Sequence, residues 1–159
     1  MKLKYALLAL LLAFSFQSSA ALVTAESYLA DQGQNYLQRL SNIVNRLNDD
    51  FNLVCNDSYC HGIYDLFKPL SIQCFVESTS GTVEYCVWAI AKSRSWVAGN
   101  GKVSNDGQIY FCEFLPKMTI QQMIDKIEFT RAPGQTPYLS VILPGVEQSL
   151  AQSLARCLK

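Results

Sequence analysis

Six cysteines offer the most reactive chemistry in this sequence, and their spacing indicates which kind. They are Cys55, Cys60, Cys74, Cys86, Cys112 and Cys157. Zinc sites use short pairs such as C-x₂-C or H-x₃-H, whereas four residues separate the closest pair here, Cys55 and Cys60. A thioredoxin-like redox site would need a C-x-x-C motif, which is also absent. An even number of cysteines at these spacings therefore favours three structural disulfides.

His61 is the only imidazole in the chain, so base catalysis by histidine would depend on it. Such a base needs a nucleophile within hydrogen-bond reach, and we expect the neighbouring Cys60 to be oxidised and inert. No Gly-x-Ser-x-Gly turn or other local nucleophile motif occurs. We interpret His61 as an ordinary loop residue.

Carboxylates supply two further candidate sites. Glu77 and Glu84 would approach each other across a hairpin, as an acid–base pair requires, but surface charge on a hairpin edge is the simpler interpretation. Oxygen ligands suited to calcium gather at Asp49, Asp50, Asn56 and Asp57. This segment lacks the glycine turn and terminal glutamate of an EF-hand loop, so we predict no metal and no other cofactor.

The segment that begins at Lys92 and runs into a glycine-rich turn is the predicted contact surface. It places a tryptophan beside basic and hydroxyl side chains, and aromatic and arginine residues dominate binding hot spots. A protein or glycan partner is predicted to bind through Lys92, Arg94, Trp96 and Asn100. The competing interpretation is that Trp96 fills the core beneath a loop.

The N-terminal segment predicts export. Lys2 and Lys4 precede an apolar run at residues 5–14, and small residues follow. The run is about half as long as the roughly 20 residues that span a bilayer. This is the layout of a secretory signal peptide, here of bacterial type, cleaved near Ala20/Ala21. We assign residues 1–20 to the signal peptide and residues 21–159 to a single secreted or periplasmic domain.

Charge and hydropathy exclude two classes of function. Without Lys2 and Lys4, 11 basic and 13 acidic side chains remain, a formal charge of −2. The basic residues are scattered, whereas a nucleic-acid binder needs a concentrated positive face. No second apolar run approaches 18 residues, so we expect no integral membrane segment after the signal peptide.

Two segments rich in β-branched and aromatic residues predict a β-hairpin. Residues 71–78 and 82–91 flank a three-residue turn that ends at Gly81, where a left-handed conformation favours glycine. Centring the turn on its middle residue places Cys74 opposite Cys86, within reach of a cross-strand disulfide.

This pairing leaves four cysteines for two further bridges, Cys55–Cys60 and Cys112–Cys157. Residues 83–98 also fit a helix, because apolar side chains recur on one face, charges suit the helix dipole and Gly99 could end it. Periodicity alone does not separate these two interpretations. We prefer the strand.

The regions outside the hairpin predict helices and one further strand. Apolar residues at three- and four-residue spacing over residues 24–48 predict an amphipathic helix, which either packs in the core or pairs with a second chain. Residues 94–107 contain two turn signals and predict a loop or a very short hairpin. Residues 108–114 predict a strand.

The C-terminal part begins with a capping box, Thr119 with Gln122, that starts a helix through about residue 129. Residues 138–143 predict a strand, and a last helix is predicted from about Gly145. Together these elements indicate an α+β fold, with a long N-terminal amphipathic helix, a small antiparallel sheet, C-terminal helices and disulfides.

The absence of common nucleophile, metal and phosphate motifs favours a non-catalytic binding protein. It would be a secreted factor that acts on a macromolecular partner, for example in virulence, or a periplasmic inhibitor or adaptor. The alternative is a small secreted hydrolase of an uncommon type that uses carboxylates or His61. A deep cavity with converging polar groups would favour the hydrolase, and an exposed apolar or aromatic patch would favour the binding protein.

Overall fold

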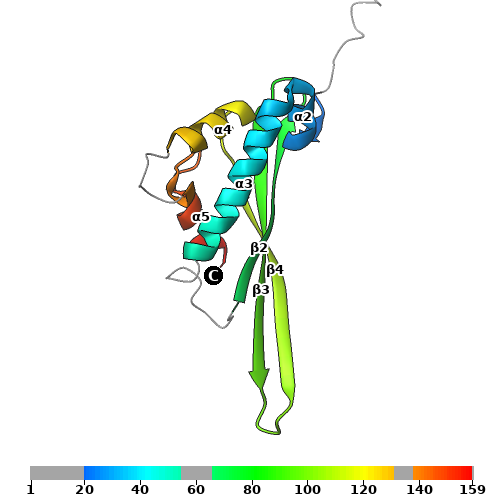
Figure 1. Cartoon of the computed structure of the whole chain (residues 1–159), viewed down its shortest axis with the longest axis vertical. Coiled ribbons are helices and arrows are strands. Elements are labelled where there is room, and N and C mark those ends of the chain that lie inside the picture. The colour runs from blue at the N-terminus through cyan, green and yellow to red at the C-terminus, as the bar shows by residue number, and fades with distance from the viewer. Residues whose placement is uncertain (1–19, 55–65, 131–137, 159) are drawn as a thin grey trace, which may run out of the picture.

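The computed structural model describes residues 20–54, 66–130 and 138–158. These residues form four α-helices and a four-stranded antiparallel sheet, so the predicted α+β class is confirmed (Figure 1). The proposed Cys55–Cys60 bridge, His61, Asn56 and Asp57 lie outside the described residues. Residues 1–19 of the predicted signal peptide also lie outside them.

The sheet has the strand order β1-β2-β3-β4. Its strands are β1 (Leu22–Thr24), β2 (Leu66–Glu77), β3 (Val83–Val97) and β4 (Val103–Phe114). β2 and β3 form the predicted hairpin, in which Cys74 lies directly opposite Cys86 and is disulfide-bonded to it. The helical interpretation of residues 83–98 is therefore wrong. β3 pairs with a strand on each side, and such pairing suits its β-branched and aromatic residues.

The turn between β2 and β3 confirms the role predicted for Gly81, which has φ +67°. Its backbone N–H donates to the Glu77 carbonyl at 2.8 Å. The register next to the turn differs from the prediction, because Val76 rather than Glu77 lies opposite Val83. A shift of register between Phe75 and Val76 marks a β-bulge, which no simple count of residues from the turn predicts.

Residues 94–107 form neither a loop nor a short hairpin, and this prediction is wrong. β3 continues to Val97 and pairs with β4 as far as Val103. Only the first turn signal forms a turn, closed by a hydrogen bond from Gly101 N–H to the Ala98 carbonyl at 2.8 Å. The second signal, Asn105-Asp106-Gly107, lies within β4, because cross-strand pairing overrides its local preference.

The helices are α2 (Ala25–Gln32), α3 (Gln34–Val54), α4 (Ile120–Phe129) and α5 (Leu150–Cys157). Residues 24–48 therefore do not form the single helix expected from their periodicity. Gly33 separates α2 from α3 with φ +112°, a conformation outside the helical region. The capping box of α4 is confirmed, with both Thr119–Gln122 hydrogen bonds present.

Residues 138–143 do not form the predicted strand. They begin with a short 3₁₀ helix, η2 (Tyr138–Ser140), that packs against α3. The apolar alternation still buries Leu139, Val141 and Leu143, but against the core rather than within a sheet. The last helix starts at Leu150 rather than near Gly145, because Ser149 and Gln152 form its capping box.

Helices α3, α4 and α5 lie to one side of the sheet (Figure 1). The sheet side chains in the core cluster occupy alternate positions on the strands, apart from Val83 beyond the bulge: Ile72, Cys74, Val76, Val83, Cys86, Trp88, Ile90, Cys112 and Phe114. Each large apolar side chain buried in this way contributes about 1.5–3 kcal/mol. The intervening side chains of β2, β3 and β4 point to the other side of the sheet.

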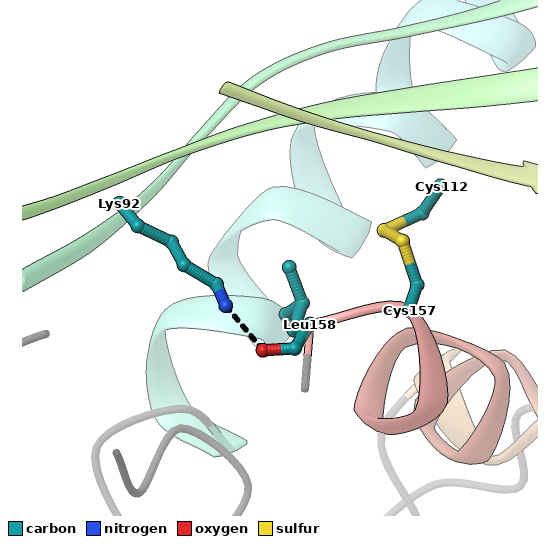
Figure 2. Close-up of a disulfide and its surroundings, with 4 residues drawn as sticks. All are labelled: Lys92, Cys112, Cys157 and Leu158. Atoms are coloured by element: carbon teal, nitrogen blue, oxygen red, sulfur yellow. Dashed lines mark hydrogen bonds between the residues drawn. A yellow bond between two sulfur atoms is a disulfide. The ribbon is translucent and has the colours of Figure 1, made fainter. Parts of the chain in front are cut away.

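A second disulfide joins β4 to the C-terminal helix. Cys112 is bonded to Cys157 with their Cα atoms 5.6 Å apart, as predicted, and Figure 2 shows the bridge beside the end of α5. Within the described ranges, we find no helix both long and apolar enough to span a bilayer.

Candidate functional site

β3 and β4 extend beyond the rest of the sheet as a two-stranded hairpin arm, residues 94–106. The first residue of β2, Leu66, pairs with Ser93, so among the described residues the following part of β3 pairs only with β4. Figure 1 shows the arm projecting past all of the labelled helices. Side chains on both faces of the arm are therefore accessible to a partner.

Arg94 and Trp96 lie two residues apart on β3 and so share one face of the arm. The Arg94 guanidinium carbon is 4.8 Å from the centroid of the Trp96 ring, within range of a cation–π interaction. Trp96 is 39% exposed and is not part of the core cluster. It therefore does not fill the core beneath a loop.

Asn100 lies in the turn at the tip of the arm. Its side-chain oxygen accepts a hydrogen bond from the backbone N–H of Lys102 at 3.0 Å. This contact gives Asn100 a part in shaping the turn. The structure thus brings Arg94 and Trp96 together and places Asn100 at the far end of the same arm.

Lys92 lies at the base of the arm and is only 4% exposed. Its Nζ donates a hydrogen bond to the backbone carbonyl of Leu158 and lies 3.8 Å from the centroid of the Tyr110 ring (Figure 2 shows the hydrogen bond). A lysine at this position also suits the negative end of the α5 dipole. Its assignment to an exposed contact surface is wrong, because the end of α5 packs over this part of β3.

The bulge removes the register that would place Glu77 and Glu84 on adjacent diagonal positions of the hairpin, because Val83 pairs with Val76. Glu77 is in register with Leu22 of β1 and accepts a hydrogen bond from the Ser80 hydroxyl. Glu84 is exposed and has no partner in the register of β2 and β3, because it lies at the bulge. The register therefore does not support the acid–base pair.

The proposed calcium ligands within the described residues are Asp49, which is exposed, and Asp50. Asp50 accepts a hydrogen bond from the backbone N–H of Tyr138, which links α3 to η2. In the described ranges, no group of three or more His, Cys, Asp or Glu side chains is arranged to hold a metal.

Sequence reasoning missed an ion-pair cluster that joins α3 to α4. Arg39 Nη2 lies 2.6 Å from both Glu128 Oε2 and Asp125 Oδ1. These hydrogen bonds, with Glu128 first, hold the pKa of Arg39 above its ordinary value. The only signal in the sequence was the i, i+3 spacing of the two acidic residues. We interpret the cluster as structural because Arg39 of α3 binds both carboxylates of α4 and so joins the two helices.

A small interior cavity of 20 Å³ lies between the sheet and the helices. Its lining is apolar apart from Glu26. About one water molecule fits in such a volume, so the cavity is too small for a substrate. It does not have the converging polar groups expected of a hydrolase. Two larger hollows, of about 600 Å³ beside Arg39, Asp125 and Glu128 and about 560 Å³ beside Glu84, Lys117 and Gln122, are open to solvent rather than deep.

The other feature that sequence reasoning missed is the open face, formed by the side chains of β2, β3 and β4 that point away from the helices. It carries Leu66, Ile109 and Phe111, which are 61%, 51% and 69% exposed. The sequence indicated this face only at residues 108–114, where apolar side chains occur on both faces of the predicted strand.

The hairpin arm and the open face are thus the two candidate binding surfaces of the described residues. Comparison with known proteins adds no further candidate: no family model, no curated protein and no solved structure matches this chain. We therefore infer the function of this chain from the chemistry and geometry of the hairpin arm and the open face.

Proposed function

We propose that this chain is an exported, disulfide-stabilised, non-catalytic binding protein that acts on a protein partner through its hairpin arm. The observation that carries the proposal is Arg94 stacked on the exposed ring of Trp96. In the cell it would be a secreted factor or a periplasmic inhibitor or adaptor.

The two disulfides support a location outside the reducing cytosol. Cys74–Cys86 and Cys112–Cys157 both join elements of the core, and structural bridges of this kind persist in oxidising compartments. The signal peptide predicted at residues 1–20 supplies the route to such a compartment.

The arm suits a binding role for two reasons. Stacking on Trp96 restrains the Arg94 side chain before a partner arrives, which lowers the entropy lost on binding. Aromatic and arginine side chains also carry much of the binding energy in protein interfaces.

Near the tip of the arm, Val97 and Val103 are paired and exposed. These valines and the backbone edges of the two strands favour a protein partner over a glycan, because a partner strand can pair with such an edge.

The experiment uses the purified chain as bait against periplasmic and culture-supernatant proteins, and in parallel against a glycan panel. We expect Trp96→Ala and Arg94→Ala each to lose the captured protein while the melting temperature falls by less than about 3 °C. The matched control is Phe129→Ala, which removes an exposed aromatic ring from α4, away from the arm.

Three results would contradict the proposal. Capture could be unchanged in both arm variants, or binding could be confined to glycans. Alternatively, Trp96→Ala could lower the melting temperature by 10 °C or so, which would make Trp96 a structural residue.

A further inference from the structure

The open face carries apolar side chains where an antiparallel sheet that faces water normally carries polar ones. One-sided sheets show a regular alternation of apolar and polar residues along each strand. In β3, Val87, Ala89 and Ala91 occupy the open face and alternate with the core residues Trp88 and Ile90. Such apolar runs are typical of strands that are covered on both faces.

Helices α3, α4 and α5 cover only the other face of the described sheet. On the open face of β3 and β4, Ala89 is buried but lies outside the core cluster, whereas Phe111 and Ile109 are exposed. Contiguous exposed apolar patches mark interaction sites. The open face therefore needs a covering partner.

The shape of the open face is self-complementary. Phe111 is in register with Ala89, and Ile109 is in register with Ala91. Large side chains on β4 thus stand beside small ones on β3. The projecting ring of one copy can pack over the alanines of a second copy, and the reverse contact forms at the same time, as a two-fold interface requires.

The charges of the open face are self-complementary too. Lys68 of β2 pairs with Ala91, and Glu113 of β4 pairs with Val87. Along β3, Ala89 lies midway between Ala91 and Val87. Lys68 and Glu113 are both exposed and lie on opposite sides of Ala89. A two-fold axis that is parallel to the sheet and passes over Ala89 can therefore bring each lysine to the glutamate of the other copy.

In this arrangement the strands of the two sheets cross at a large angle, close to the orthogonal class of sheet packing.

We propose that the chain forms a two-fold dimer through its open face, in which Phe111 packs over the alanines and Lys68 pairs with Glu113 of the second copy. Glu77 of β2 lies on the same face, so Lys68, Glu113 and Glu77 give it a net charge of −1, which disfavours an anionic membrane as the occupant. The dimer goes beyond the proposed function and does not depend on it.

Sedimentation velocity of the purified, disulfide-intact chain over a range of concentrations tests the dimer. We expect a dimer at about 100 µM. Lys68→Glu or Glu113→Lys alone should raise the dimer dissociation constant at least about tenfold, because each turns two attractive contacts into repulsive ones. The double charge exchange should restore the wild-type constant to within about threefold, and mixing the two single variants should give a heterodimer.

A second pair of variants tests the apolar contact. Phe111→Asp should abolish the dimer, whereas Phe129→Asp, on an exposed ring of α4, should leave it intact. Circular dichroism confirms that each variant is folded, and the charge variants remain decisive if Phe111→Asp is not. A wild-type chain that stays monomeric, or charge reversals that leave the dimer unaffected, would overturn the proposal. Trp96→Ala should leave the dimer unchanged, so failure of the arm hypothesis is distinguishable from failure of the dimer.

Discussion

Gly81 shows at the scale of one residue how closely the turn of a hairpin can be tied to the core. Its φ of +67° lies in the left-handed region that side chains other than glycine rarely adopt. A Cβ atom added there would lie 2.5 Å from the ring of Tyr28, which belongs to α2. Both the backbone conformation and the packing therefore select glycine.

Gly81→Ala should lower the free energy of unfolding by about 2–4 kcal/mol, as the sum of the left-handed strain and the clash with Tyr28. Urea unfolding followed by circular dichroism measures the loss. Gly99→Ala is the control, because no atom lies within 4 Å of its added Cβ, and its effect should stay below about 1 kcal/mol. Equal effects of the two substitutions would contradict both the left-handed strain and the clash with Tyr28.

Lys92 shows why residue type alone misplaces a side chain. A lysine two residues from an arginine indicates a basic surface, and Lys92 and Arg94 do share one face of β3. The difference is that the end of α5 packs over Lys92 and buries it, whereas Arg94 stays partly exposed. The burial of Lys92 thus depends on Leu158, which lies 66 residues away in the chain.

At the scale of elements, α5 is held to the sheet at two points close to its C-terminal end. Cys157 is bonded to β4, and the Leu158 carbonyl accepts the hydrogen bond from Lys92 of β3 (Figure 2). The other described bridge joins strands that a tight turn already holds together. The two disulfides therefore constrain the unfolded chain to different degrees.

Replacing both Cys112 and Cys157 by alanine should destabilise the chain by about 4 kcal/mol, and replacing both Cys74 and Cys86 by about 3 kcal/mol. The order follows from the loops that the bridges close, with sequence separations of 45 and 12 residues. Urea unfolding of the two double variants measures the difference. A larger loss from the hairpin bridge would mean that packing, rather than chain entropy, dominates its contribution.

At the scale of the whole molecule, the two proposals place partner binding on the arm and dimer formation on the open face. The open face lies alongside the core, whereas the β3–β4 arm, which carries Arg94 and Trp96, projects beyond the helices (Figure 1). A dimer formed through the open face would carry two arms. It could bind a repeated or two-fold symmetric partner with an avidity greater than the affinity of either arm.

Mass spectrometry of the purified chain tests the predicted signal-peptide cleavage and the predicted disulfides, on which these proposals depend. We expect an N-terminus at Ala21 or Leu22, and a mass that rises by about 6 Da on reduction as three disulfides become six thiols. Alkylation without reduction is the control and should add no mass. Free or zinc-bound thiols in the native chain would contradict the disulfide scaffold and reopen redox or metal chemistry.

The sequence by itself determined the features that depend on near neighbours. The Cys74–Cys86 bridge follows from a glycine turn between two strand-forming segments, and the start of α4 follows from side chains three residues apart. In these places the interacting groups lie within a few residues of one another, so propensity and spacing contain the necessary information.

Only the tertiary structure decided the length of the arm, the helical start of residues 138–143, the burial of Lys92 and the exposure of the open face. Each of these depends on which distant segment covers a given surface. The same apolar alternation can be buried by a sheet or by a helix, and the same turn signal can be overridden by a pairing strand. Long-range packing chooses between these outcomes because it contributes more free energy than local propensity does.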